Sequence, residues 1–357
     1  MKIAIDIWHP SDIHFFKNFM SIMEKKGHSF LVTSRKKDII TNLLDSYGIA
    51  HTVASRKGEG VIGLSRELLE HNYKLLKAAR KFKPDIFLAF GGMSISHVGT
   101  LLRKPSISFY DTEHAKLIKL VTLPFITKVC TPQSYSDDYG KKQIRFKAYK
   151  EMAHLLPQYY TPDDSILDVL GVQKDEPYFL LRFISWNASH DIGVKGLSDK
   201  AKIQLVHLLE KHGKVFISAE ENQLVPELRG RALSIDPKRY FDVISHAQLV
   251  VTEGETTATE AVILGTPAIY ANPLLTGVMT EQIEKYGIVE HITNEEKLLT
   301  RVNEMVHDES LQEKLDVKRK MLLQDKIDLT QWMVEYVSNY PLKKSRKSSR
   351  SKFRRFL

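Results

Sequence analysis

The stretch LVVTEGETTATEAVILGTPAIY at residues 249–270 predicts the architecture of the second half of the chain. The apolar, β-branched run that begins at 249 is typical of a buried parallel strand. A Gly/Thr turn follows the strand and opens a helix over 256–264, and Gly265 and Pro267 then turn the chain into another apolar strand. This succession of strand, helix and strand indicates a parallel sheet with helical crossovers.

The same alternation runs through most of the chain. In the first half we predict strands at 2–8, 28–34, 50–55, 85–90, 105–111 and 128–132. In the second half we predict strands at 177–185, 214–220, 233–236, 249–254 and 266–273, and consider one at 288–292. The pattern predicts an α/β protein with two tandem Rossmann-like, doubly wound domains.

A break in the alternation indicates where one domain gives way to the next. Two prolines bracket an aromatic pair within 154–171, a segment typical of a linker. We therefore expect a first domain over 1–158 and a second over 159–325, which agrees with roughly 150 residues per domain. Residues 326–342 include an amphipathic helix, and 343–357 read as a disordered basic tail.

Composition excludes several classes of protein. Hydrophobic residues make up 43% of the 357, which is enough apolar surface for a core. No apolar run reaches the roughly 18 residues of a membrane span, and the N-terminus does not resemble a signal peptide. A single cysteine, Cys130, excludes an intrachain disulfide and a cysteine-rich zinc site. We expect a cytoplasmic protein that uses no metal and no cofactor.

The net charge of +9 suggests a nucleic-acid binder, but its distribution does not. Residues 343–357 contain eight Lys/Arg and no acidic residue, so residues 1–342 carry only +1. The tail is either a solvated segment or a peripheral contact with the anionic inner face of the membrane, where each basic residue contributes about 1 kcal/mol. RNA association is a lesser alternative.

Ligands of open α/β sheets bind beyond the carboxyl ends of the strands. After the first strand, Ser11 or Asp12 can cap a helix, which leaves it open whether His9 contacts a ligand or is incidental. His14 falls in the first helical turn, where it can act as a general base.

Two further strand ends of the first domain carry polar or glycine-rich residues. Gly91 and Gly92 allow a ligand or another backbone to approach closely, and Ser94 follows them. Asp111, Glu113 and His114 follow the 105–111 strand. Either Asp111 caps a helix and Glu113 complements its dipole, or the three side chains line the cleft.

In the second domain the 249–270 stretch is the most informative. Gly254, Thr256 and Thr257 open a helix whose N–H groups and hydroxyls can hold a phosphate. Glu260 lies one turn further, where a carboxylate can accept hydrogen bonds from ribose hydroxyls. The alternative is an ordinary capped helix with a surface glutamate.

Two other strands of this domain end in polar residues. Arg182, ahead of Ser185, can clamp a diphosphate, or it can pair with an internal acid. Ser218 and Glu220 end the 214–220 strand and can line the nucleobase side.

Residues 249–272 resemble the nucleotide-binding segment of GT-B enzymes, the two-Rossmann-domain glycosyltransferases and non-hydrolysing UDP-N-acetylglucosamine 2-epimerases. The resemblance rests on the Glu260-Ala261 pair and Gly265-Thr266-Pro267. It implies that the glutamate binds ribose, that the small residues before it bind the diphosphate, and that terminal helices cross back to the first domain. With HPSDIHFFKNF, DTEHA and RFISWNASHD, the chain looks most similar to an uncharacterised bacterial and archaeal family of this superfamily.

Departures from the epimerase pattern favour glycosyl transfer. Epimerases carry Gly-Asp-Thr where this chain has Gly91-Gly92-Met93, and a Glu-Glu pair where it has Thr259-Glu260. We therefore expect a nucleotide-sugar donor, with UDP foremost, and a glycan or lipid-linked acceptor of cell-surface polysaccharide synthesis. His14 or Asp111 would deprotonate the acceptor. An epimerase-like enzyme and a non-catalytic nucleotide- or RNA-binding protein remain as alternatives.

Overall fold

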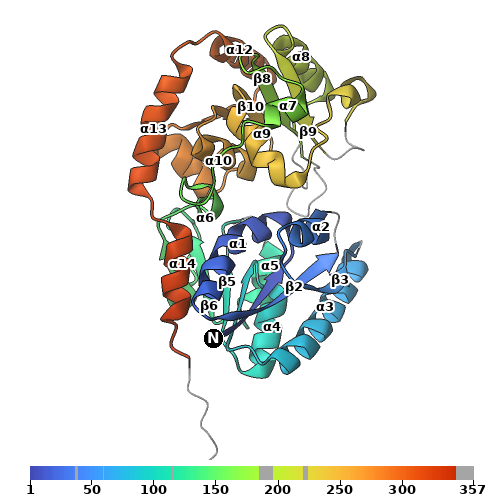
Figure 1. Cartoon of the computed structure of the whole chain (residues 1–357), viewed down its shortest axis with the longest axis vertical. Coiled ribbons are helices and arrows are strands. Elements are labelled where there is room, and N and C mark those ends of the chain that lie inside the picture. Colours follow the sequence, from blue (N-terminus) through green and yellow to red (C-terminus); the bar gives the residue numbers. More distant parts are fainter. Residues whose placement is uncertain (37–38, 59, 114–115, 185–195, 220–223, 343–357) are drawn as a thin grey trace, which may run out of the picture.

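The computed structural model describes residues 1–36, 39–58, 60–113, 116–184, 196–219 and 224–342 (Figure 1). It contains two parallel sheets, one in each half of the chain, with helices packed against them. The α/β class and the two doubly wound sheets are as predicted. Within these residues, no helix is both long and apolar enough to cross a membrane.

The first sheet has seven strands in the order β3-β2-β1-β4-β5-β6-β7. Their bounds are β1 Lys2–Ile7, β2 Ser29–Lys36, β3 Thr52–Arg56, β4 Ile86–Phe90, β5 Ser106–Phe109, β6 Lys128–Pro132 and β7 Gln143–Phe146. Ile3 pairs with Phe30 on one side and with Ile86 on the other. The strand order reverses at β1, so the loops after β1 and β4 flank a crevice of the kind in which α/β proteins bind ligands.

Helices cover both faces of the first sheet. They are α1 Pro10–Lys25, α2 Ile39–Ser46, α3 Gly60–Phe82, α4 Met93–Leu102 and α5 Lys116–Thr122. The buried face of α1 includes Phe15, Phe16 and Phe19, and the first two rings pack edge-on against Phe109 of β5. Burying several aromatic rings fixes α1, and with it the loop after β1, against the sheet.

The second sheet has five strands in the order β12-β11-β10-β8-β9. Their bounds are β8 Tyr178–Arg182, β9 Lys214–Ser218, β10 Leu249–Thr252, β11 Ala268–Tyr270 and β12 Val289–His291. The main helices around it are α8 Asp199–Leu209, α9 Tyr240–His246, α10 Glu255–Leu264, α12 Glu295–Val306 and α13 Leu311–Asp325. Arg182 pairs with Thr252 at the carboxyl ends of β8 and β10, where this sheet reverses its order.

The end of the chain returns to the first sheet, as the resemblance implied. α13 lies beside the second half, and α14 Leu329–Ser338 lies beside α1 (Figure 1). The Thr330 hydroxyl donates to the carbonyl of Ala153 in α6 Met152–Leu155 at 2.7 Å. This buried contact ties the terminal helix to the segment between the two sheets.

Two local predictions were wrong. β7 was not predicted, although it pairs with β6 and extends the first sheet. Residues 233–236 are not a strand, because the only pairing recorded there, among the described residues, is an isolated bridge between Ile217 and Ala232. The strand predicted at 177–185 does appear, as β8.

Candidate functional site

A cavity of about 430 Å³ lies between the carboxyl ends of the two sheets. From the first half it is lined by His9, Pro10, Ser11, His14, Ile39 and Leu43. From the second half it is lined by Arg182, Ile184, Ser218, Leu233, Ile235, Pro237, Tyr240, Phe241, Gly254, Glu255, Thr256, Thr257 and Glu260. We call this cavity the cleft. It contains all of the described residues that we predicted to bind the nucleotide-sugar.

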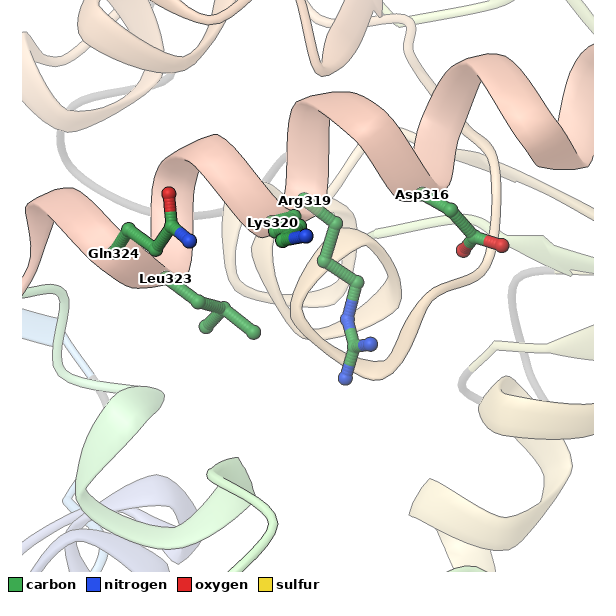
Figure 2. A pocket seen from close by; sticks show the side chains of 5 residues that line it. All are labelled: Asp316, Arg319, Lys320, Leu323 and Gln324. Atoms are coloured by element: carbon green, nitrogen blue, oxygen red, sulfur yellow. The ribbon is translucent and has the colours of Figure 1, made fainter.

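A cavity of similar size, about 450 Å³, lies on the second half along α13 (Figure 2). Its lining consists of Asp316, Arg319, Lys320, Leu323 and Gln324, all from one helix. The Arg319 Nε donates to the carbonyl of Ile263 at 2.7 Å, so this arginine also anchors α13 to the end of α10. None of the predicted site residues lies in this cavity.

The amino end of α10 opens into the cleft. Gly254 is its N-cap and offers no side-chain hydrogen bond to the first turn, and the first helical bond runs from Ala258 to Gly254. The amides of the first turn of a helix have no acceptor within the helix. Together with the hydroxyls of Thr256 and Thr257, they form a place that favours an anion.

Arg182 lies beside this helix end. Its Nη1 donates to the hydroxyl of Ser218 at 2.6 Å, which fixes the guanidinium at the cleft wall. Among the described residues no carboxylate forms an ion pair with Arg182, so the predicted alternative of an internal acid finds no support there. The Tyr240 hydroxyl in the same wall is buried and makes no hydrogen bond to a described residue.

Glu260 lies in α10 as predicted, but its chemical state differs from the expectation. Burial raises the pKa of its carboxyl to about 8, even though Lys150 and Arg182 act in the opposite direction. At neutral pH the group is therefore mainly an uncharged acid, which can donate as well as accept a hydrogen bond. An uncharged side chain also avoids repelling an anionic ligand.

A buried ion-pair cluster lies between the two halves next to the cleft. Lys150 Nζ lies 3.1 Å from Asp111 Oδ2 and 3.8 Å from Glu151 Oε1. Burial by itself would lower the pKa of Lys150, but the charges of Asp111, Glu151 and Glu255 outweigh it and raise that pKa. Burial raises the pKa of Glu151 and of Glu255 to about 8 in each case.

This cluster gives Asp111 a role that the sequence did not predict. Asp111 neither caps a helix nor lines the cleft, because its carboxylate is held by Lys150 and accepts from the Thr112 hydroxyl at 2.9 Å. Lys150, Glu151 and Glu255 were all missed as site residues. The missing signal was β7, since Lys150 and Glu151 follow closely on the carboxyl end of that unpredicted strand.

His9 is the N-cap of α1 and also lines the cleft. Its ring accepts from the Ser11 amide at 3.3 Å, while the Asp12 carboxylate accepts from the His9 amide at 2.9 Å. This is a capping box with a histidine in place of the usual serine or threonine. The helix is capped, but by His9 and not by Ser11 or Asp12 as predicted, and Asp12 takes the N3 position of the box. The His9 ring still reaches the cleft wall.

His14 is a wall residue of the cleft with little exposure. Burial, together with Lys17 and His9, lowers the pKa of its ring to about 3. The ring stacks on His154 with 5.4 Å between centroids and meets Phe241 edge-on at 4.8 Å. The uncharged imidazole can accept a proton, but the free protein makes it a weak base.

Gly91, Gly92 and Ser94 do not line the cleft. Both glycines have positive φ, and a Cβ on Gly92 would meet Ser108 Cβ at 2.9 Å, so the doublet permits a tight turn against β5. The Ser94 hydroxyl is buried and has no hydrogen-bond partner among the described residues. A tight turn therefore accounts for both glycines, and neither needs a ligand to explain it.

Glu113 connects the two halves of the molecule. Its Oε1 accepts from the amide of Gly277 at 3.0 Å and from that of Ser136 at 3.2 Å. It therefore holds the start of α11 Gly277–Thr280 against the first half, and it does not line the cleft. The predicted residues His114, Ser185 and Glu220 lie outside the described residues.

Glu253, which we did not predict as a site residue, is buried under the cleft. Its carboxylate accepts from the amides of Ile184 at 3.0 Å and Leu197 at 2.8 Å. It thereby fixes the chain immediately after Arg182. Its position directly before the helix-opening glycine was a signal that the sequence contained.

Comparison with known proteins agrees with this architecture. Residues 1–342 match the family described as protein of unknown function, DUF354. The chain belongs to this family. A relative of uncharacterized function from Methanocaldococcus jannaschii is 25% identical over 352 residues, covering 95% of this chain and 98% of the relative.

Solved structures show the same fold at low identity. A UDP-GlcNAc 2-epimerase from Methanocaldococcus jannaschii has a TM-score of 0.62 and 13% identity, covering 90% of this chain and 100% of its own. A Streptomyces sp. SF2575 glycosyltransferase, SsfS6, complexed with thymidine diphosphate, has a TM-score of 0.62 and 13% identity, covering 94% and 99%. The chain therefore has the GT-B fold, as its resemblance to GT-B enzymes implied.

Proposed function

We propose that this protein is a glycosyltransferase that moves a sugar from a nucleotide-sugar, with UDP as the nucleotide, to a glycan or lipid-linked acceptor. The observation that carries the proposal is the convergence of Arg182, the uncapped amino end of α10 and Glu260 on one cleft. A guanidinium and a set of free amides favour a diphosphate.

The second half of the chain would hold the donor. Arg182 and the amides of the first turn of α10 would bind the diphosphate and stabilise the charge that develops on it as the sugar leaves. Glu260 would exchange hydrogen bonds with the ribose hydroxyls. Leu233 and Ile235, beside Ser218, supply an apolar wall suited to the nucleobase.

The first half would present the acceptor. His14 faces the cleft as an uncharged imidazole, so it can take the proton of an acceptor hydroxyl. The anionic diphosphate would stabilise the imidazolium and raise the basicity of the ring. Asp111 would act indirectly, by pairing with the charged Lys150 next to the cleft. His9, the N-cap of α1, would lie beside the acceptor.

An epimerase-like reaction on a UDP-sugar is the second candidate, because an epimerase shares the fold and three protonatable carboxyls adjoin the cleft. Incubation with UDP-N-acetylglucosamine alone separates the two. Release of UDP only when an acceptor is added supports transfer, whereas a 2-epimer formed without acceptor contradicts it.

Calorimetric titration with UDP tests the donor site directly. Arg182→Ala should weaken UDP binding roughly 10- to 100-fold, because a charge-assisted hydrogen bond contributes about 1.5–3 kcal/mol. Arg319→Ala, in the cavity along α13, is the matched control and should bind UDP like the unaltered protein. The opposite result, loss with Arg319→Ala alone, would move the site to that second cavity.

A cytoplasmic location with peripheral attachment at the inner face of the membrane completes the proposal. Its support is the sequence of 343–357, whose eight basic residues suit an anionic surface. These residues lie outside the part of the chain that the structure describes.

A further inference from the structure

The layer formed by α3, α4 and α5 carries the most exposed large apolar side chains in the part of the chain that the structure describes. Among the described residues, the four most exposed large hydrophobic side chains are Ile62, Leu69, Leu120 and Leu101, at 86, 71, 71 and 69%. All four lie on these three helices. Tyr73, one turn after Leu69, is 66% exposed. Several strongly exposed apolar side chains on neighbouring helices are typical of an interaction site.

The three helices form one continuous layer. Asn72 Nδ2 of α3 lies 3.1 Å from His97 Nδ1 of α4, and His97 Nε2 lies 3.0 Å from the carbonyl of Val121 in α5. The Thr100 hydroxyl of α4 donates to the carbonyl of Phe125 just beyond α5, at 3.1 Å. The exposed side chains therefore lie on adjacent helices of one layer, and we call the solvent side of this layer the α3–α5 face.

The charge of this face is positive. Residues 86–110 and 114–136 contain no aspartate or glutamate at all. Arg66, Lys77, Arg80 and Arg103 are exposed on or beside the same helices. The exposed carboxylate of Glu70 on α3 is paired with Lys74 at 2.6 Å.

We propose that the α3–α5 face lies on a membrane surface rich in anionic lipids. Apolar side chains that enter the boundary of the acyl chains, bordered by lysine and arginine that meet lipid phosphates, are the combination that binds such a surface. A protein partner would be expected to offer carboxylates, whereas a bilayer satisfies both features of the face at once. The inference rests on the membrane attachment in the proposed function and deepens it by naming a contact surface in the described part of the chain. None of the cleft residues lies on this face.

The end of the described chain agrees with this orientation. α14 runs to the end of the first half that is remote from the second half, the end at which α4 also lies (Figure 1). The sequence beyond Leu342 then supplies eight more basic residues.

Co-sedimentation with vesicles tests the proposal. The full chain is mixed with vesicles of phosphatidylcholine alone and with vesicles that also contain phosphatidylglycerol. We expect binding to the anionic vesicles. The combined variant Leu69→Ser, Leu101→Ser and Leu120→Ser should lower the partition coefficient at least tenfold. Val317→Ser with Met321→Ser, which removes exposed apolar side chains from α13, is the matched control and should leave it unchanged.

Repeating the comparison in a full-length chain whose eight tail Lys/Arg are replaced by Gln separates the face from the tail. The proposal requires that the chain with the altered tail still binds anionic vesicles, and that the triple substitution in this chain removes that binding. If the triple variant binds as well as its parent chain in both backgrounds, the proposal is overturned. So would light scattering that shows a dimer which the triple substitution dissociates, since a second copy would then cover the face. UDP titration of the same variants reports separately on the cleft.

Discussion

Lys150 Nζ lies 3.1 Å from Asp111 Oδ2, and this ion pair joins the first sheet to the carboxyls beside the cleft. The lysine follows β7 and the aspartate follows β5, so the contact is made between loops at the carboxyl edge of one sheet. Because Asp111 is buried and the Lys150 side chain is only 16% exposed, the free energy of the pair depends on both partners being present.

Lys150→Met should therefore lower the free energy of unfolding by about 3 kcal/mol, the usual effect of leaving a buried charge without its partner. Lys147→Met is the matched control. Lys147 pairs with Asp325 at 2.7 Å, but its side chain is 44% exposed, so its loss should cost less than about 1 kcal/mol. Urea unfolding at pH 7 measures the free energy of unfolding of both variants. Equal decreases in the two variants would contradict a larger contribution from the Lys150–Asp111 pair.

Donor binding should weaken as the pH rises above neutrality. Burial raises the pKa of Glu260 to about 8, so its carboxyl is protonated at pH 7 and becomes a carboxylate facing the diphosphate by pH 9. We expect the Kd for UDP to increase several-fold over this interval, and Glu260→Gln to reduce the dependence. The part that remains belongs to Glu255, which also lines the cleft and has a pKa of about 8. Glu296→Gln, exposed on α12, is the control and should retain the full dependence.

Acid should destabilise the protein through His154. Burial and the neighbouring His14 lower the pKa of His154 well below its usual range, so the unfolded chain takes up a proton near pH 6.5 and the folded chain does not. The free energy of unfolding therefore falls as the pH drops below about 6.5.

His154→Leu tests this interpretation. Both ring nitrogens of His154 are buried without a partner among the described residues, so leucine should raise stability by about 1 kcal/mol or more at pH 7. The gain should be larger at pH 5, because the variant has no proton to exclude. His207→Gln, on an exposed ring of α8, should leave the pH dependence as it was, and a gain that does not change with pH would refute the linkage.

Two glycines should respond differently to an added methyl group. Gly254 has a φ of −96°, and a Cβ there would lie 3.5 Å from Ile184 Cγ2 and from Thr252 Oγ1. Gly254→Ala should therefore fold normally, while its methyl group at the start of α10 weakens UDP binding severalfold. Gly92→Ala should instead destabilise the fold by about 1–3 kcal/mol, because φ is 79° and Ser108 is too close. Thermal unfolding beside UDP titration distinguishes the two effects.

The local sequence pattern predicted most of the strands and the order of strand and helix in both sheets. The apolar run of 249–252, the Gly254 turn and the Gly265 helix end lie within a few residues of one another, and the structure places β10, α10 and β11 there. Periodicity fails where a strand is short and half polar, as in β7. It also fails where an apolar segment forms an isolated bridge but no ladder, as at 233–236.

The sequence by itself determined the two parallel sheets, the return of the terminal helix through its resemblance, and the residues at the amino end of α10. Only the tertiary structure decided what Asp111, Glu113 and His154 do, because Lys150, Gly277 and His14 approach them across loops distant in sequence. Strand and helix signals arise from neighbouring residues, whereas burial and ion pairing depend on which strand ends the topology brings to one edge.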